Sequence, residues 1–198
     1  MTALPQFLTH YYKRTVGPFR HLTEHSTEEA ELLLQRLRDS GTGFAAKRSP
    51  NYLAIRLGLE ARMREQFQSK GGLPSRSAPY YLVLGDCDWL LDWYPNAAKL
   101  VVPLAAIPPM QISFTYGDSF PAMRVQDGKP YRGQVYTLAE LPGVLSAYGL
   151  PQEWNGRRAA CSRTVYRGAA LGRRSTPGVH CPSFHTARSS HRAVFGVT

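Results

Sequence analysis

No apolar run in this 198-residue chain is long enough to cross a membrane, because a spanning helix needs about 20 apolar residues. The most apolar stretch, residues 97–110, is interrupted by one lysine and three prolines. The first residues also lack the charged start and the apolar segment of a signal peptide. We therefore expect a soluble, cytoplasmic protein without a membrane partner.

Cysteine is scarce, with three in the chain, which favours reduced thiols over a disulfide framework. Cys161, His180, Cys181 and His185 are residue types that suit zinc, but no Cys-x2-Cys pair is present and two of them are adjacent. Cys87 lies between two aspartates, which disfavour its thiolate and hence a nucleophilic role. The sequence thus predicts no metal ligands.

Acidic residues are missing from the last part of the chain. Of the 24 basic and 14 acidic side chains, eight arginines and no acidic residue fall in residues 155–198, so residues 1–154 are almost neutral. The tail cannot bury enough apolar surface to offset the entropy of ordering it. We expect one domain at residues 4–154 and an arginine-rich tail at residues 155–198.

The tail has three interpretations. It is a disordered segment, a basic arm that binds nucleic acid through phosphate contacts, or a frame-shifted translation product. The last fits its composition, because Arg, Ala, Gly, Ser and Pro have GC-rich codons. Translating the other two frames from around codon 155 would test it, since one of them should give an acidic, strand-like continuation.

Two helices are expected near the N-terminus. Residues 26–29 (Ser-Thr-Glu-Glu) form a capping-box pattern, apolar residues follow at helical spacing, and Gly41 supplies a left-handed end. A second helix should open at Ser49-Pro50 and end at residues 71–72, both glycine.

Strands are expected after residue 79. Residues 80–84 and 99–104 read as buried strands, and residues 111–116 alternate in polarity. Asp127-Gly128 is typical of a tight turn, here joining strands at 123–126 and 131–136. A last helix should begin either at the capping-box pattern of residues 137–140 or nearer Pro142, and should end at Tyr148-Gly149. We therefore expect an α+β fold, with helices on the N-terminal side, then a mostly antiparallel sheet and a further C-terminal helix.

Four short motifs carry a resemblance to a known family: Lys70-Gly71-Gly72-x-Pro74 and residues 112–118, 131–137 and 148–154. On these motifs the chain is similar to an uncharacterised bacterial protein family, over about residues 8–155. The resemblance implies a fold but no activity. It also implies an acidic, aromatic strand after residue 155, where this chain has its arginine-rich tail, and this difference favours the frame-shift interpretation.

Polar aromatic residues on turns beside strands are the main candidates for a ligand site. Residues 10–14 and 17–21 interleave basic and aromatic side chains, which suits an anionic or nucleotide-like ligand, and residues 116–118 lead from a strand into a polar loop. We expect a small polar or anionic ligand to be bound. The expected ligand-binding residues are His10, Tyr11, Arg20, Tyr116 and Asp118.

The alternative is an enzyme, a transferase or hydrolase acting on a nucleotide-type substrate. In that case Asp86 and Asp88 could hold a metal ion, or His10 could position the substrate. A His-Tyr strand ahead of a glycine-terminated helix also resembles the start of ADP-ribosyltransferase-like domains. That resemblance would require a glutamate in the pocket, for which Glu153 is the candidate.

Overall fold

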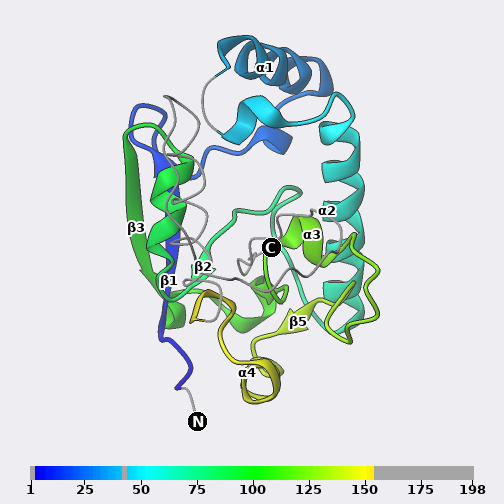
Figure 1. The fold of residues 1–198 in the computed structure, drawn as a ribbon. Coiled ribbons are helices and arrows are strands. Elements are labelled where there is room, and N and C mark those ends of the chain that lie inside the picture. Colours follow the sequence, from blue (N-terminus) through cyan, green and yellow to red (C-terminus); the bar gives the residue numbers. More distant parts are fainter. Residues whose placement is uncertain (1–2, 42–43, 154–198) are drawn as a thin grey trace, which may run out of the picture.

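A three-stranded antiparallel sheet forms one side of the molecule in the computed structural model, which describes residues 3–41 and 44–153 (Figure 1). Its strand order is β2–β1–β3, so β1 is central. The bounds are Phe7–Lys13 for β1, Val83–Leu84 for β2 and Ala97–Pro103 for β3. In the sequence, two long helices fall between β1 and β2, and further helices follow β3. The α+β class expected from the sequence is confirmed.

Strand β1 contains the His-Tyr segment, for which the sequence suggested a strand only in the ADP-ribosyltransferase-like alternative. Its residues 8–11 are all buried, since a central strand is covered on both faces. Leu8 belongs to the largest apolar cluster, together with Leu84, Ile112, Phe114 and Leu141. The sheet therefore forms around a strand that precedes both N-terminal helices.

Strand β3 differs from the buried strand expected at residues 99–104. Leu100 and Val101 are 37% and 51% exposed, and Lys99 is also on the surface. The physical reason is position: among the described residues β3 pairs only with β1, at an edge of the sheet. The run of apolar residues predicted a strand that is covered on both faces, but an edge strand can leave part of its surface exposed.

Helix α1 (Thr27–Ser40) begins with the expected capping box, and both hydrogen bonds of this motif are present. The Ser26 hydroxyl accepts from the Glu29 amide at 3.3 Å, and the Glu29 carboxylate accepts from the Ser26 amide at 3.1 Å. Gly41 ends the helix with φ +62°, a conformation that favours glycine. Ala30 and Leu34 are its buried residues and pack with Leu53 of the second helix.

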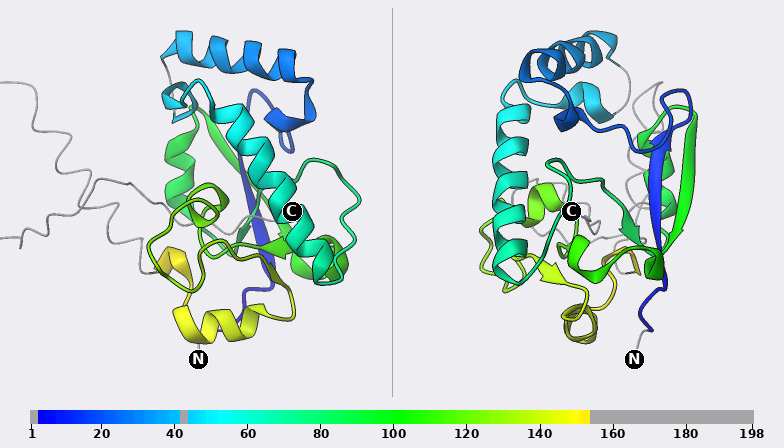
Figure 2. Two further views of the ribbon diagram at one scale, coloured as in Figure 1. Left: turned by 90° about the vertical axis from the view of Figure 1, so that its right-hand side faces the viewer. Right: turned by 180° about the vertical axis from the view of Figure 1, so that it is seen from behind.

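Helix α2 (Tyr52–Ser69) lies on the side of the molecule opposite the sheet, with α1 across one end (Figures 1 and 2). It begins later than expected: its N-cap is Asn51, and Ser49 and Pro50 form a turn before it. The Ser49 hydroxyl donates to the Asn51 side chain and so does not cap the helix. The buried face of α2 includes two charged residues, Arg56 and Glu60.

The expected hairpin around Asp127-Gly128 is wrong. The second sheet pairs β4 (Ser113–Phe114) with β5 (Tyr136–Thr137), and short helix α3 (Ser119–Ala122) follows β4. Residues 123–135 contain turns but no strand. The Asp127 carboxylate accepts two bonds from the Arg132 guanidinium at 3.0 Å each, which folds the segment back on itself.

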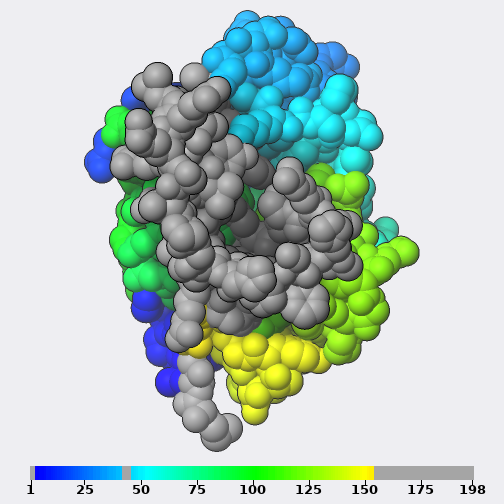
Figure 3. Space-filling view, in the orientation of Figure 1, coloured from blue at the N-terminus to red at the C-terminus, as the bar shows by residue number. Residues whose placement is uncertain are grey.

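Helix α4 (Leu141–Tyr148) begins one residue before Pro142, as one of the two starts considered. The Glu140 carboxylate accepts from the Thr137 amide at 2.7 Å. Helices α1 and α4 lie at opposite ends of the face shown in Figure 3.

Within residues 3–41 and 44–153, no helix is both long and apolar enough to span a membrane. The tail at residues 155–198 lies outside the described residues.

Candidate functional site

Two charged side chains are buried together on α2. Arg56 is 8% exposed and Glu60 is 6% exposed, and the Arg56 Nε atom lies 3.0 Å from the Glu60 Oε1 atom. They are one helical turn apart, which places them on the same face of the helix. Charged groups are rarely buried to this degree unless they are paired, and here each neutralises the other.

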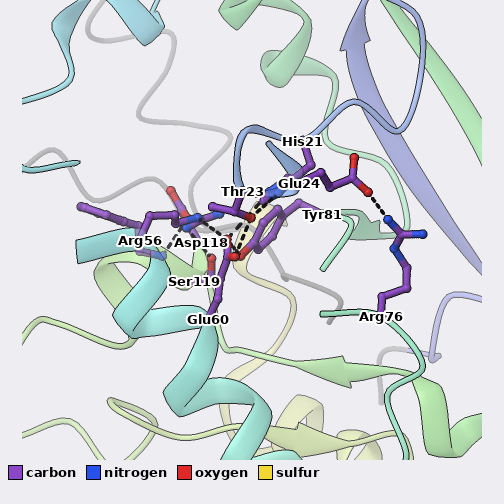
Figure 4. A network of polar contacts seen from close by, with 10 residues as sticks. His21, Thr23, Glu24, Arg56, Glu60, Arg76, Tyr81, Asp118 and Ser119 are labelled. Atoms are coloured by element: carbon purple, nitrogen blue, oxygen red, sulfur yellow. Dashed lines mark hydrogen bonds and ion pairs between the residues drawn. The ribbon is translucent and has the colours of Figure 1, made fainter. Parts of the chain in front are cut away.

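The Glu60 carboxylate also binds two distant parts of the chain. The Tyr81 hydroxyl donates to Oε1 at 2.8 Å, and the Thr23 hydroxyl donates to Oε2 at 2.7 Å. His21 approaches the same carboxylate, with Nε2 at 3.9 Å from Oε1. Figure 4 shows these side chains gathered around Glu60. The carboxylate thus joins α2 to the segment before α1 and to the segment before β2.

Arg56 makes further contacts on the opposite side of the pair. Its guanidinium donates to the Ser119 hydroxyl at 3.2 Å and lies 4.1 Å from the centre of the Tyr81 ring (Figure 4). Burial raises the pKa of Tyr81 well above its ordinary value, so its hydroxyl stays protonated and can donate to Glu60. We call His21, Thr23, Arg56, Glu60, Tyr81 and Ser119 the buried network.

His21 is held neutral in this surrounding. Its pKa is lowered to about 3, chiefly by burial and then by the charges of Arg56, Arg48 and Arg76. Because the Thr23 hydroxyl gives its proton to Glu60, the His21 Nδ1 atom, 2.7 Å away, is the donor to Thr23. Burial disfavours the charged imidazole, and the nearby arginines add to this effect.

A pocket of about 180 Å³ lies beside the buried network. Glu60 and Arg64 of α2 line it, as do the end of β3 and the segment between α2 and β2. Its charged and hydroxyl side chains are Glu60, Arg64, Ser75, Arg76 and Ser77. Its ring and apolar side chains are Phe19, Pro74, Pro79, Tyr80, Leu82, Val102 and Ile107.

The two pocket arginines differ in their partners. The Arg64 guanidinium donates to the carbonyl of Pro74 at 3.1 Å and to that of Arg76. Arg76 pairs with the Glu24 carboxylate, and its guanidinium lies 4.1 Å from the centre of the Tyr80 ring. Among the described residues, Arg64 forms no ion pair with a carboxylate. Its two hydrogen-bond partners in this part of the chain are neutral carbonyl oxygens.

Stacked rings form one wall of the pocket. The Phe19 ring lies 5.0 Å from Tyr80 and 4.7 Å from His10, centre to centre. The Phe19 amide donates to His10 Nε2 at 3.0 Å, so His10 carries its proton on Nδ1 and donates to the Tyr81 carbonyl. Phe19 has φ +55°, which is strained for a residue with a side chain. These contacts hold it in that conformation.

The five residues expected to bind a ligand do not lie on one surface. His10 and Tyr11 are consecutive in β1, so their side chains point to opposite faces of the sheet. Only His10 is near the pocket, through its contact with Phe19. Arg20 is exposed and is not among the pocket residues.

Tyr116 and Asp118 lie elsewhere. The Tyr116 hydroxyl donates to the Tyr148 carbonyl at 2.7 Å, in a group of tyrosine rings beside α4. The Asp118 carboxylate accepts from the Phe120 amide at 3.0 Å and so caps α3, beside the buried network (Figure 4). Glu153, the candidate glutamate of an ADP-ribosyltransferase-like site, is exposed and is not a pocket residue.

The acidic cluster at Asp86 and Asp88 meets a cation of the protein. The Lys99 ammonium lies 3.1 Å from Asp86 and 2.9 Å from Asp88. Tyr11 accepts from the Cys87 amide at 2.6 Å, and burial, with Asp88 and Asp86, raises the pKa of Cys87 to about 12. Within the described ranges, no group of three or more potential ligands is arranged to hold a metal ion.

Sequence reasoning missed Arg56, Glu60, Arg64, Arg76 and Tyr81. The signal available was the period of α2, since residues 56, 60 and 64 are spaced by one helical turn beside the apolar stripe at Leu59 and Met63. A charge on the edge of an apolar stripe is usually solvated, so the period alone did not distinguish a buried pair from a surface pair.

Comparisons with protein-family models, curated proteins and solved structures find no match for this chain.

Proposed function

We propose that this protein binds a small anionic ligand with a flat ring in the pocket between α2 and residues 74–82. The observation that carries the proposal is that two arginines, Arg64 and Arg76, line the same pocket as two aromatic rings, Phe19 and Tyr80. Arginine binds carboxylate and phosphate groups through two parallel hydrogen bonds, and aromatic rings stack on flat groups.

The electrostatics of the pocket favour an anion. Arg64 has no carboxylate partner among the described residues, and Glu60, the acidic side chain of the pocket, is paired with Arg56. The pKa of His21 is lowered chiefly by burial, and the positive charge of the pocket residue Arg76 is among the smaller causes. Ser75 and Ser77 add hydroxyl groups that can donate to an anion.

Isothermal titration of the full chain against inorganic phosphate, nucleoside monophosphates and aromatic carboxylates tests the proposal. Arg64→Gln should weaken binding of any ligand found by tenfold or more, because one charge-assisted contact is lost. Arg36→Gln is the matched control, since Arg36 is exposed on α1 and outside the pocket. Failure of every compound to bind, or equal binding by Arg64→Gln, would overturn the proposal.

The remaining expectations stay predictions. A cytoplasmic, bacterial protein is still expected from the sequence, and so is a catalytic role as the alternative to binding alone. Nucleic-acid binding through residues 155–198 also stays a prediction, because the tail lies outside the described residues. Truncation after Asn155 tests it: affinity for nucleic acid that is unchanged by truncation would exclude the tail as the binding element.

A further inference from the structure

We infer that the ligand of this pocket is an aromatic α-amino acid, whose carboxylate binds Arg64 and whose amino group donates to Glu60. The inference rests on the proposed function and narrows it to one ligand class. Four features of the pocket support it: the spacing of the two charged side chains, the acceptor capacity of Glu60, the ring wall and the volume.

Glu60 and Arg64 present opposite charges one turn apart on α2, and both line the pocket. Side chains at this spacing have Cβ atoms about 5–6 Å apart. An α-amino acid carries its amino group and its carboxylate on the same carbon, so both groups can reach such a pair at once. A nucleotide has no comparable pair of adjacent opposite charges.

The two side chains are turned to other partners and are not joined to each other. Among the described residues, Glu60 pairs with Arg56, whereas Arg64 donates to the backbone of residues 74 and 76. An ionised carboxylate has about four acceptor positions, and Glu60 uses three, for Arg56, Tyr81 and Thr23. One position on Oε2 is left for a donor from a ligand.

The walls of the pocket suit an aromatic side chain. Phe19 and Tyr80 supply rings, and Leu82, Val102 and Ile107 supply aliphatic surface. The volume of about 180 Å³ lies below the range of roughly 300–1,000 Å³ that is usual for drug-sized ligands. It therefore fits one amino acid better than a dinucleotide.

The experiment is isothermal titration calorimetry of the full chain with three related probes. L-Phenylalanine carries both groups, 3-phenylpropionate lacks the amine, and 2-phenylethylamine lacks the carboxylate. We expect phenylalanine to bind at least tenfold more tightly than either analogue, because a site built for a hydrogen bond rejects ligands that leave it unpaired. Arg36→Gln, outside the pocket, should bind like the native chain.

Two variants assign the contacts. Glu60→Gln should reduce affinity for phenylalanine tenfold or more and leave that for 3-phenylpropionate within about twofold, whereas Arg64→Gln should weaken both. The probe comparison on the native chain stands even where a variant does not fold. Equal binding of phenylalanine and 3-phenylpropionate would overturn the inference and leave the proposed function intact. Binding by phosphate or a nucleotide, but by none of the three probes, would also overturn it. Absence of binding by every anion would overturn both.

Discussion

Arg56 and Glu60 form a buried ion pair on α2, with 3.0 Å between the Arg56 Nε and Glu60 Oε1 atoms. Removing two charges from water is costly, and their mutual attraction compensates only when other hydrogen bonds satisfy both groups. Here Tyr81 and Thr23 donate to the carboxylate and Ser119 accepts from the guanidinium. The pair thus connects α2 to three other segments of the chain.

The first prediction concerns the stability of this pair. Arg56→Met should lower the free energy of unfolding by about 3–5 kcal/mol, because Glu60 is left as a buried charge without its cation. Arg56→Met combined with Glu60→Leu should recover much of the loss, because no uncompensated charge remains. Urea unfolding of the single and double variants measures the coupling.

Arg62→Met is the control for that series. Arg62 lies on the same helix but is exposed, and its guanidinium donates to the carbonyls of Met123 and Gly133 at 3.3 Å and 3.5 Å. It should cost less than about 1.5 kcal/mol, because both hydrogen bonds are long and water can replace them at this exposed position. A double variant as unstable as the sum of its single variants would show that Arg56 and Glu60 are not coupled.

The second prediction concerns pH. The pKa of His21 falls from 6.5 to about 3 on folding, so the unfolded chain binds one more proton than the folded chain between these values. This contribution to stability is complete above about pH 6.5 and is lost as the pH falls toward 3. Its slope is at most about 1.4 kcal/mol per pH unit.

His21→Gln should remove that part of the slope, whereas His25→Gln, at a more exposed position beside Glu29, should leave it unchanged. Urea unfolding at pH 4, 5, 6 and 7 gives the three profiles. Buried carboxylates add their own acid dependence, but they are common to all three chains and cancel in the comparison. Parallel profiles for His21→Gln and the native chain would contradict the assignment.

The third prediction contrasts Gly58, inside α2, with Gly72, which follows the end of this helix. Gly58 has helical neighbours and no atom within 4 Å of an added Cβ, so Gly58→Ala should stabilise the protein by about 0.5–1 kcal/mol. A Cβ at Gly72 would come within 2.5 Å of the buried Phe67 ring, so Gly72→Ala should destabilise it by about 1–3 kcal/mol. Thermal unfolding measures both, and the same sign for the two variants would contradict the packing described.

Local signals in the sequence were sufficient for the bounds of α1. The capping box at Ser26 and Glu29 and the stop at Gly41 involve residues within one turn of the helix end, so α1 could be predicted closely. Strands were harder, because their burial depends on neighbours far along the chain. The apolar run in β3 reads the same whether it is a central or an edge strand, and the structure places it at the edge.

The candidate site could not be predicted for the same reason. Of the five expected ligand residues, only His10 lies next to the pocket, and it acts by holding the Phe19 ring. The interleaved basic and aromatic residues at 17–21 include Phe19, which lines the pocket, and His21, which belongs to the buried network. Which of those side chains turn inward depends on the packing of α2 against them.

The sequence by itself determined the class of the fold, the bounds of α1 and the near neutrality of residues 1–154, because helix ends and composition are local or additive properties. Only the tertiary structure decided which charges are buried and which residues line a pocket. Glu60 meets Tyr81 and Thr23 across 21 and 37 positions of the chain. Contacts at such separations form only when the elements pack together, and no local pattern in the sequence specifies them.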